Sequence, residues 1–353
     1  MDRLVRATLY EGYILYPYRP SSVKNQVRWT FGGVHPRAYS AATGGNEPWS
    51  IQTECLLRAP DDCLVTVTVR FLRPVARIAA APLPVGATVA AVDRCGLPGF
   101  HAVEALHAGD TVVRTWEEAV EDSVAVGTQP LDRLLEEPRR VAFTRPGHRD
   151  VENVHGPDGG LVGAVVRDHK PLDGEILVSA VRVNDEVARV AVVISNLTAF
   201  EPAGDGARER ALRHSLVSTH AILEAVDGRW ISLADPPDDL IAGASGCRNV
   251  GLWPVLVGDD DDHDDTVLAS PIILEDHPRL APESAGDLFD STEIDEILSL
   301  RILTLTDAEK AEVRGADARA HALLERTESL SGDDLMRLHG TIRELRPVRG
   351  EGA

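Results

Sequence analysis

The sequence predicts an α+β protein, with a mostly antiparallel β-sheet or sandwich body over residues 1–290 and a C-terminal helical segment over residues 291–353. Runs of β-branched, partly alternating residues separated by turn residues fill the first part of the chain. The Asp227-Gly228 dipeptide lies directly between two apolar runs, as hairpin turns do. Helical spacing of apolar residues begins only near residue 291, so strands come first and helices last.

The predicted strands of the body follow one another at short intervals. Cys55 and Cys63 flank the loop "LLRAPDD", which predicts a β-hairpin across which the two thiols could face each other. An Asn-Asp turn predicts a second hairpin over Glu175–Thr198. The stretch "HRDVENVHGPDGGLVGAVVRDHKPLDG" is rich in Gly, His and Asp and is interpreted as a long loop or weak strands, with a sub-boundary near residues 150–172. The stretch 110–126 is ambiguous, because Trp116 and Val120 could share a helix face while its valine-rich ends favour a strand. Further strands are predicted over residues 215–237, 249–258 and 266–274.

Three helices are predicted in the C-terminal segment. An Asp-x-x-Glu variant of the capping box begins the first at Asp290, and a Thr-x-x-Glu box begins the second at Thr306. Gly315 weakens the second helix in its middle. Ser331 can cap the third, whose leucines and isoleucine follow helical spacing.

Composition is typical of a water-soluble globular protein, with 43% hydrophobic and 26% charged residues. A net charge of −20 disfavours binding to the phosphates of nucleic acids. The longest apolar stretch, Ile78–Val92, is interrupted by prolines and glycine, so no membrane span is predicted. The N-terminus has no continuous apolar region of the secretory type, and a cytoplasmic location is expected.

The four cysteines form no CxxC pair, which argues against a zinc ribbon, a redox dithiol or a local iron–sulfur motif. Reduced, buried thiols are the expected state. No G-x-G-x-x-G or G-x-x-x-x-G-K-[ST] pattern occurs, so the dinucleotide and P-loop phosphate cradles are missing. No cofactor is predicted.

Metal-binding patterns in the sequence are weak. His220 and Glu224 have the i, i+4 spacing of helical zinc ligands, but on a strand they lie about 13 Å apart. A pair at this distance cannot share one ion, so His220 is only a weak candidate for a metal ligand. His277 is a second weak candidate. The acidic run 258–265 has the composition of a calcium loop without its glycine and terminal glutamate, and a solvated hairpin tip is the favoured interpretation.

A second set of residues could supply acid–base or nucleophilic chemistry. Asp276, His277 and Glu283 lie where a predicted strand gives way to a Pro-containing linker, and they have no assigned structural role. Cys247 lies beside Arg248, and a neighbouring cation can lower the pKa of a thiol. These residues are the catalytic candidates, against the simpler interpretation of turn residues and an ordinary loop cysteine.

Two surfaces could bind a protein partner. The N-terminal residues Arg19, Lys24, Arg28 and Trp29 combine cations with an aromatic face, which suits an acidic partner surface or the protein's own carboxylates. The C-terminal stretch "EIDEILSLRIL" carries apolar residues on more than one helix face and must pack on its own domain or on another chain.

The chain also resembles an uncharacterised family of proteins encoded near actinobacterial-type nickel–iron hydrogenases. Four stretches carry this resemblance: "EGYILYPYRPSSVKNQVRWTFGGVHP", "STHAILEAVDGRWISLADPP", "GCRNVGLWPVLVG" and "LASPIILEDHPRLAPESAGDLFDSTEIDEILSLRILTLTD". The resemblance implies an accessory or assembly role and transfers no catalytic residue.

Two functional hypotheses follow. The first is a non-catalytic accessory protein that binds a protein partner, with a hydrogenase component as one such partner. The second is an enzyme whose metal or acid–base site is assembled from His, Asp, Glu and Cys residues distant in sequence. A large structural assembly is a third idea, and the sequence leaves the oligomeric state open.

Overall fold

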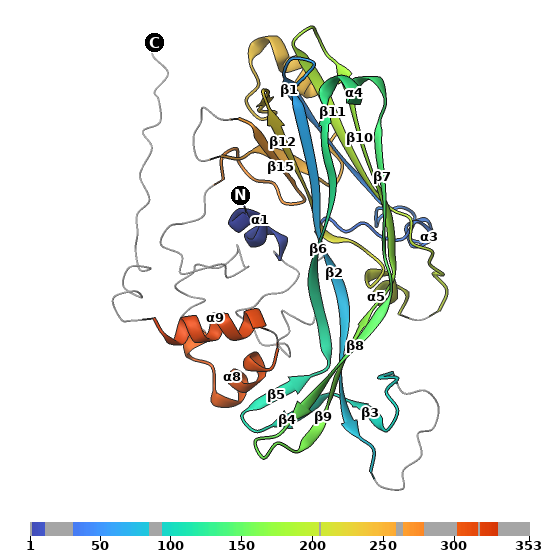
Figure 1. Ribbon diagram of the computed structural model, residues 1–353, viewed down its shortest axis with the longest axis vertical. Helices are drawn as coiled ribbons and strands as arrows, with labels where there is room; N and C mark the ends of the chain where they lie inside the picture. Colours follow the sequence, from blue (N-terminus) through green and yellow to red (C-terminus); the bar gives the residue numbers. More distant parts are fainter. Residues whose placement is uncertain are drawn as a thin grey trace.

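Two antiparallel sheets form the body of the protein (Figure 1), as a computed structural model shows for residues 2–10, 31–84, 94–204, 206–258, 264–278, 302–316 and 318–330. The five-stranded sheet has the order β13–β1–β11–β10–β7, and the eight-stranded sheet has the order β14–β15–β12–β2–β9–β8, with β3 and β6 also paired to β2. Short helices lie at the N-terminus, in connections and near the C-terminus. The predicted α+β class is confirmed.

The strands of the five-stranded sheet are β1 (Ser50–Arg58), β7 (Arg139–Arg145), β10 (Leu172–Arg182), β11 (Val187–Asn196) and β13 (Arg229–Ile231). Those of the eight-stranded sheet are β2 (Leu64–Pro82), β3 (Phe100–Val103), β6 (Trp116–Pro130), β8 (His148–His155), β9 (Leu161–His169), β12 (Val217–Val226), β14 (Trp253–Leu256) and β15 (Thr266–Ser270). A separate ribbon joins β4 (Ala105–Ala108) to β5 (Thr111–Arg114). The helices are α1 (Asp2–Leu9), α3 (Arg37–Ala42), α4 (Leu131–Glu136), α5 (Ala207–Leu212), α6 (Ile241–Ser245), α8 (Asp307–Arg314) and α9 (Ala318–Glu328), with a 3₁₀ turn over Asp238–Leu240.

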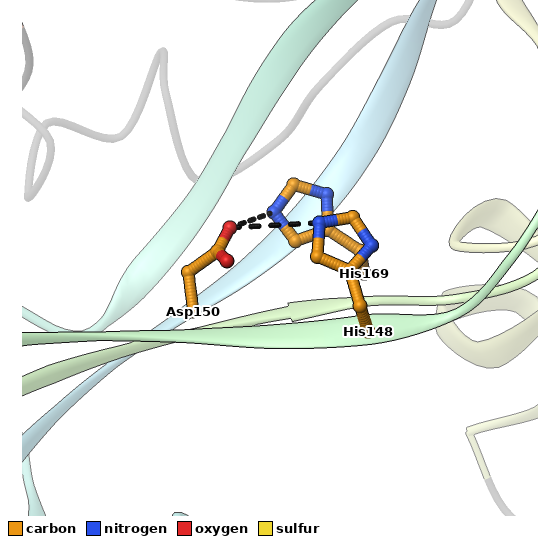
Figure 2. A group of neighbouring side chains, drawn as sticks. All are labelled: His148, Asp150 and His169. Carbon is orange, nitrogen blue, oxygen red and sulfur yellow. Dashed lines mark ion pairs between the residues drawn. The ribbon is translucent and has the colours of Figure 1, made fainter.

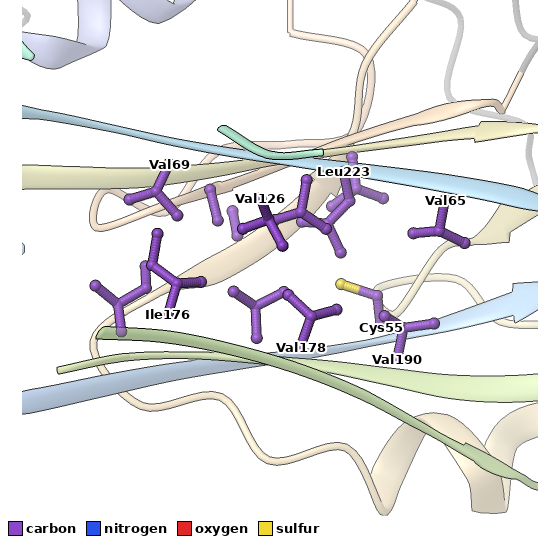
Figure 3. Packing of buried hydrophobic residues seen from close by; sticks show 14 of the residues in the cluster. Cys55, Val65, Val69, Val126, Ile176, Val178, Val190 and Leu223 are labelled. Atoms are coloured by element: carbon purple, nitrogen blue, oxygen red, sulfur yellow. The ribbon is translucent and has the colours of Figure 1, made fainter. Parts of the chain in front are cut away.

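The main hydrophobic core lies between the two sheets (Figure 3). Alternate residues of each strand point inward, as Val65, Val67 and Val69 do from β2, because successive side chains of a strand face opposite sides. From the other sheet, Val190 and Ile176 complete the contact. The alternation that identified the strands in the sequence is therefore the same pattern that fills this core.

Two long strands carry the eight-stranded sheet beyond the sandwich. β2 has 19 residues and β6 has 15, and they pair over most of their length. At the far end of β2, the strands β3 and β9 pair with it, and β8 pairs in turn with β9 (Figure 1). The His- and Asp-rich stretch therefore forms two strands of an extended sheet.

Two predicted hairpins are confirmed, β10–β11 and the pair β14–β15 on either side of the acidic run 258–265, and two are wrong. β10 and β11 pair with each other as expected. β1 and β2 do not pair, because β1 belongs to the five-stranded sheet and β2 to the eight-stranded sheet. The loop between Cys55 and Cys63 therefore crosses from one sheet to the other, and both cysteines are buried and free.

The Asp227-Gly228 turn is also a crossover between the sheets. β12 pairs with β2, whereas β13 pairs with β1. Asp227 has a φ of +64° but Gly228 has no positive φ, so the two-residue hairpin turn with positive φ at both positions is not formed. A side chain at Gly228 would lie 2.8 Å from the Cys63 Sγ, so close approach to the neighbouring connection requires the glycine.

The C-terminal helices pack on the protein's own sheet. Thr306 and Glu309 form the predicted capping box of α8. The predicted second helix is divided into α8 and α9, with Gly315 as the C-cap of α8. A side chain at position 315 would lie 2.1 Å from the carbonyl oxygen of Val112, so this close approach requires the glycine. Val313, Leu323 and other apolar residues of these helices join a second core cluster with Leu72. The helices predicted at Asp290 and Ser331 lie outside the described residues, and the division of the chain at residue 290 stays a prediction.

Candidate functional site

The most distinctive polar cluster of the described residues lies on the β8–β9 hairpin. β8 forms the edge of the eight-stranded sheet, and seven of its eight residues are exposed. His148 lies opposite His169 in the antiparallel register, and Asp150 lies opposite Arg167. Residues two apart on a strand share a face, as do directly opposed residues, so His148, Asp150 and His169 lie together on one face of the hairpin.

These three side chains converge on one point (Figure 2). The Oδ2 atom of Asp150 lies 3.5 Å from the Nε2 atom of His148 and 3.3 Å from the Nε2 atom of His169. The two imidazole rings stack with their centroids 4.1 Å apart and an interplanar angle of 11°. One ligand atom from each of the three residues lies within 4.8 Å of the others.

The three residues differ in burial. The side chain of His169 is 8% exposed, whereas those of His148 and Asp150 are 49% and 58% exposed. Burial lowers the pKa of His169 below its usual range, and His148 acts in the same direction while Asp150 opposes both. His169 is therefore neutral near pH 7, which leaves one ring nitrogen with a free lone pair.

The basic residues around the cluster are all paired with carboxylates. Arg167 contacts Glu118 at 2.9 Å and Glu152 at 2.8 Å. Asp168 accepts hydrogen bonds from Arg149 and Lys170 on the other face of β9. Among the described residues, the recorded partners of Asp150 are the two histidines alone. Two imidazoles and one carboxylate form a donor set that suits divalent first-row metal ions.

Sequence reasoning missed this cluster. The His-x-Asp spacing of His148 and Asp150 was visible, and on a strand it places both side chains on one face. The third member, His169, joins them only through the β8–β9 register, which an interpretation of this stretch as loop or weak strands could not supply.

The predicted metal candidate His220 has a structural environment. It is fully buried on β12, its Nδ1 atom lies 2.7 Å from the Ser218 carbonyl oxygen, and its Nε2 atom lies 3.2 Å from the Ser270 hydroxyl. Glu224 lies on the same strand and is exposed. No hydrogen bond or ion pair joins them, as expected for this spacing on a strand.

Asp276 and His277 belong to a turn. Asp276 accepts hydrogen bonds from the Ser232 hydroxyl at 2.5 Å and from the Leu256 backbone nitrogen at 2.8 Å. His277 has a φ of +52°, its backbone nitrogen donates to the Leu256 carbonyl oxygen, and its Nε2 atom lies 3.5 Å from an Asp264 carboxylate oxygen. Both residues therefore fix the chain after β15. Glu283 lies outside the described residues.

Cys247 is half-buried after α6, and its Sγ atom lies 3.6 Å from the Gly243 carbonyl oxygen. Burial raises the pKa of Cys247 to about 11, with Glu54 adding to the effect and Arg189 opposing it. This direction is opposite to the activation expected from Arg248 beside it. No pair among Cys247, His220, Asp276 and His277 is joined by a hydrogen bond or an ion pair.

We expect Cys247 to react slowly with iodoacetamide at pH 7.5. A thiol with a pKa of about 11 holds roughly 100-fold less thiolate than an ordinary thiol. Mass spectrometry of intact protein over time measures this rate, with a short unfolded cysteine peptide as the reference. Alkylation of Cys247 as fast as that of the peptide would contradict the raised pKa.

A Ser–His–Glu arrangement elsewhere in the molecule is structural. His35 lies 3.0 Å from the Ser215 hydroxyl and 3.0 Å from a Glu47 carboxylate oxygen. Ser215 is buried, and its hydroxyl donates to the Ala211 carbonyl oxygen at 2.7 Å. Because Ser215 is buried, its hydroxyl does not reach a substrate as the nucleophile of a catalytic triad does.

Several predicted surfaces fall outside the described residues. They are Arg19, Lys24, Arg28, Trp29, residues 259–263 of the acidic run, and most of "EIDEILSLRIL". The apolar faces of α8 and α9 contact their own chain. No helix within the described ranges is long and apolar enough to cross a membrane.

Comparison with known proteins leaves the family open. No protein-family model matches the chain, and a search of curated proteins finds no similar sequence.

Proposed function

We propose that this protein is a non-catalytic accessory or assembly protein that binds a protein partner, and that β8 is its contact surface. The observation that supports this proposal is the position of β8 at the end of the sheet order, with β9 as its single strand partner among the described residues. Such an edge offers unpaired backbone N–H and C=O groups to another chain.

The side chains of β8 favour a specific partner over unspecific aggregation. Arg149, Asp150 and Glu152 place charges of both signs along the strand, which discourages edge-to-edge pairing between arbitrary chains. Val151 stands among them and is 50% exposed. An extended segment with complementary charges and a small apolar side chain fits this pattern.

The resemblance to a family encoded near nickel–iron hydrogenases suggests a hydrogenase component or maturation factor as the partner. The four cysteines support a cytoplasmic location, because they are reduced thiols and Cys55, Cys63 and Cys95 are buried. The basic N-terminal patch around Arg28 stays a second predicted contact surface.

The enzyme hypothesis receives less support. Its described candidates lie in three separate environments: His220 is on β12, Cys247 follows α6, and Asp276 and His277 share the turn after β15. They do not form the mutual contacts that a shared acid–base site requires.

The substitution Val151→Lys is expected to reduce recovery of the partner from native lysate by about tenfold, because a lysine on an edge strand opposes further strand pairing. Val181→Lys is the matched control, since Val181 is 57% exposed on β10. Quantitative mass spectrometry of pull-downs measures both. Equal recovery with the two variants, or no stable partner with the wild type, would contradict the proposal.

A further inference from the structure

We propose that His148, Asp150 and His169 bind one divalent transition-metal ion of the kind that favours imidazole nitrogen together with a single carboxylate. This inference is independent of the proposed partner and adds a ligand-binding activity to the protein. It rests on the spacing of the donor atoms, on the unsatisfied nitrogens of His169 and on the local charge.

The donor spacing fits a metal ion. In a tetrahedral site with bonds of about 2.1 Å, neighbouring ligand atoms are about 3.4 Å apart. The Asp150 Oδ2 atom lies 3.5 Å and 3.3 Å from the Nε2 atoms of His148 and His169. Two of the three ligand–ligand distances therefore already have the required length.

The buried histidine forms no hydrogen bond with the described residues. The side chain of His169 is 8% exposed, yet neither ring nitrogen has a partner there in hydrogen-bond geometry, and Nε2 only lies 3.3 Å from the Asp150 carboxylate. Buried polar atoms in proteins are nearly always satisfied, and an ion bound at Nε2 would satisfy this one. The neighbouring His148 has its Nδ1 atom 3.4 Å from the Pro146 carbonyl oxygen. If this Nδ1 atom carries the proton and donates it to the carbonyl oxygen, the Nε2 lone pair is available to a metal. Metal-binding histidines commonly donate their other ring N–H to a carbonyl group in this way.

The charge balance also favours a cation at this point. Within the described ranges, Asp150 contacts two imidazoles and no lysine or arginine, while the nearby cations Arg167 and Arg149 are held by other carboxylates. A divalent ion would therefore neutralise Asp150 without displacing an existing ion pair. Carboxylate and imidazole together select ions such as Zn²⁺ or Co²⁺ over Mg²⁺ or Ca²⁺, which prefer oxygen ligands.

Binding requires one adjustment of the side chains. The stacked rings are nearly parallel, so they must tilt toward each other for both Nε2 lone pairs to meet at one ion. The side chain of His148 is 49% exposed, so solvent leaves room for this tilt. Three ligands from the protein leave the fourth coordination position open to water or another ligand. Structural zinc sites, by contrast, usually have four protein ligands.

Isothermal titration calorimetry of the full-length protein with Zn²⁺ alone tests this inference. We expect one Zn²⁺ site, whose affinity falls about tenfold or more in His169→Ala and in Asp150→Asn. Asp150→Asn keeps the size and shape of an exposed side chain and so leaves the fold unchanged. His155→Ala is the matched control, since His155 is an exposed histidine at the end of the same strand. Far-UV circular dichroism checks that each variant is folded.

Co²⁺ supplies a second readout through its visible absorption, which is intense only for low-coordinate sites. The wild type and His155→Ala should give the same intense bands, and Asp150→Asn should lose them. No Zn²⁺ site, or a site equally strong in Asp150→Asn and His155→Ala, would overturn the inference. Partner recovery unaffected by Val151→Lys would count against the proposed function alone.

Discussion

Acidification from pH 7 to pH 4 is expected to lower the free energy of unfolding by about 3 kcal/mol through His220 alone. His220 is fully buried between β2 and β15. Burial lowers the pKa of His220 to about 4, the Ser218 carbonyl oxygen opposes the shift, and Arg70 on β2 acts in the same direction as burial. The folded protein therefore requires the neutral ring.

The hydrogen bonds around His220 explain why the fold stabilises the neutral imidazole with its proton on Nδ1. Its Nδ1 atom donates to the Ser218 carbonyl oxygen. The Ser270 hydroxyl accepts from the Ile272 backbone nitrogen and lies 3.2 Å from Nε2, so its proton can be donated to the ring. A second proton on Nε2 removes that bond and leaves a buried charge.

The sign of the pH dependence follows from the two pKa values. His220 binds a proton below about pH 6.5 in the unfolded chain, whereas in the folded chain it stays neutral down to about pH 4. The contribution of His220 to stability is thus complete above pH 6.5 and is lost as the pH falls to 4.

Urea unfolding at pH 7 and pH 4 measures how much unfolding free energy each protein loses on acidification, and the wild type is compared with His220→Gln. Other groups titrate in the wild type and in His220→Gln alike, so we expect the variant to lose about 3 kcal/mol less on acidification. His155→Gln, at an exposed position, should behave as the wild type. An identical loss in the wild type and His220→Gln would contradict the buried neutral histidine.

The second large effect is expected from Arg77→Met, which should lower the free energy of unfolding by about 3 kcal/mol. Arg77 is 4% exposed on β2. It donates to the carbonyl oxygens of Gly315 and Ala316, and its guanidinium lies 3.1 Å from Glu118. Methionine fills the space but leaves the two carbonyl groups without this donor.

Arg77 also attaches the C-terminal helices to the sheet, because Gly315 and Ala316 connect α8 and α9. Limited proteolysis should therefore cut between α8 and α9 faster in Arg77→Met. Arg133→Met removes an exposed pair with Glu136 and is expected to change neither stability nor proteolysis. Unaltered cleavage and stability in Arg77→Met would contradict this role of Arg77.

The strands of the body were predictable because alternation and valine content report directly on burial. Val65, Val67 and Val69 alternate with exposed or half-buried residues, and their burial follows from that pattern alone. The partner of each strand was not predictable in the same way. A turn such as Asp227-Gly228 reverses the chain, but the backbone angles and the close approach to Cys63 decide that it leads into the other sheet.

The candidate site depended on the same kind of long-range information. His220, Asp276 and His277 attracted notice because they were chemically conspicuous, yet backbone carbonyl groups, hydroxyls and turn geometry account for them. His148 and His169 are 21 residues apart and meet only because β8 and β9 pair in a specific register. That register is a property of the folded sheet, and local spacing does not reveal it.

Photo-crosslinking from position 151 tests whether β8 is the surface that contacts the partner protein. A photoreactive amino acid is placed at Val151 on β8, or at the similarly exposed Val181 on β10 as the control, and the native complex is irradiated. We expect a covalent adduct with one defined partner protein from position 151 and none from position 181. No adduct from position 151, or the same adducts from both positions, would contradict β8 as the contact surface.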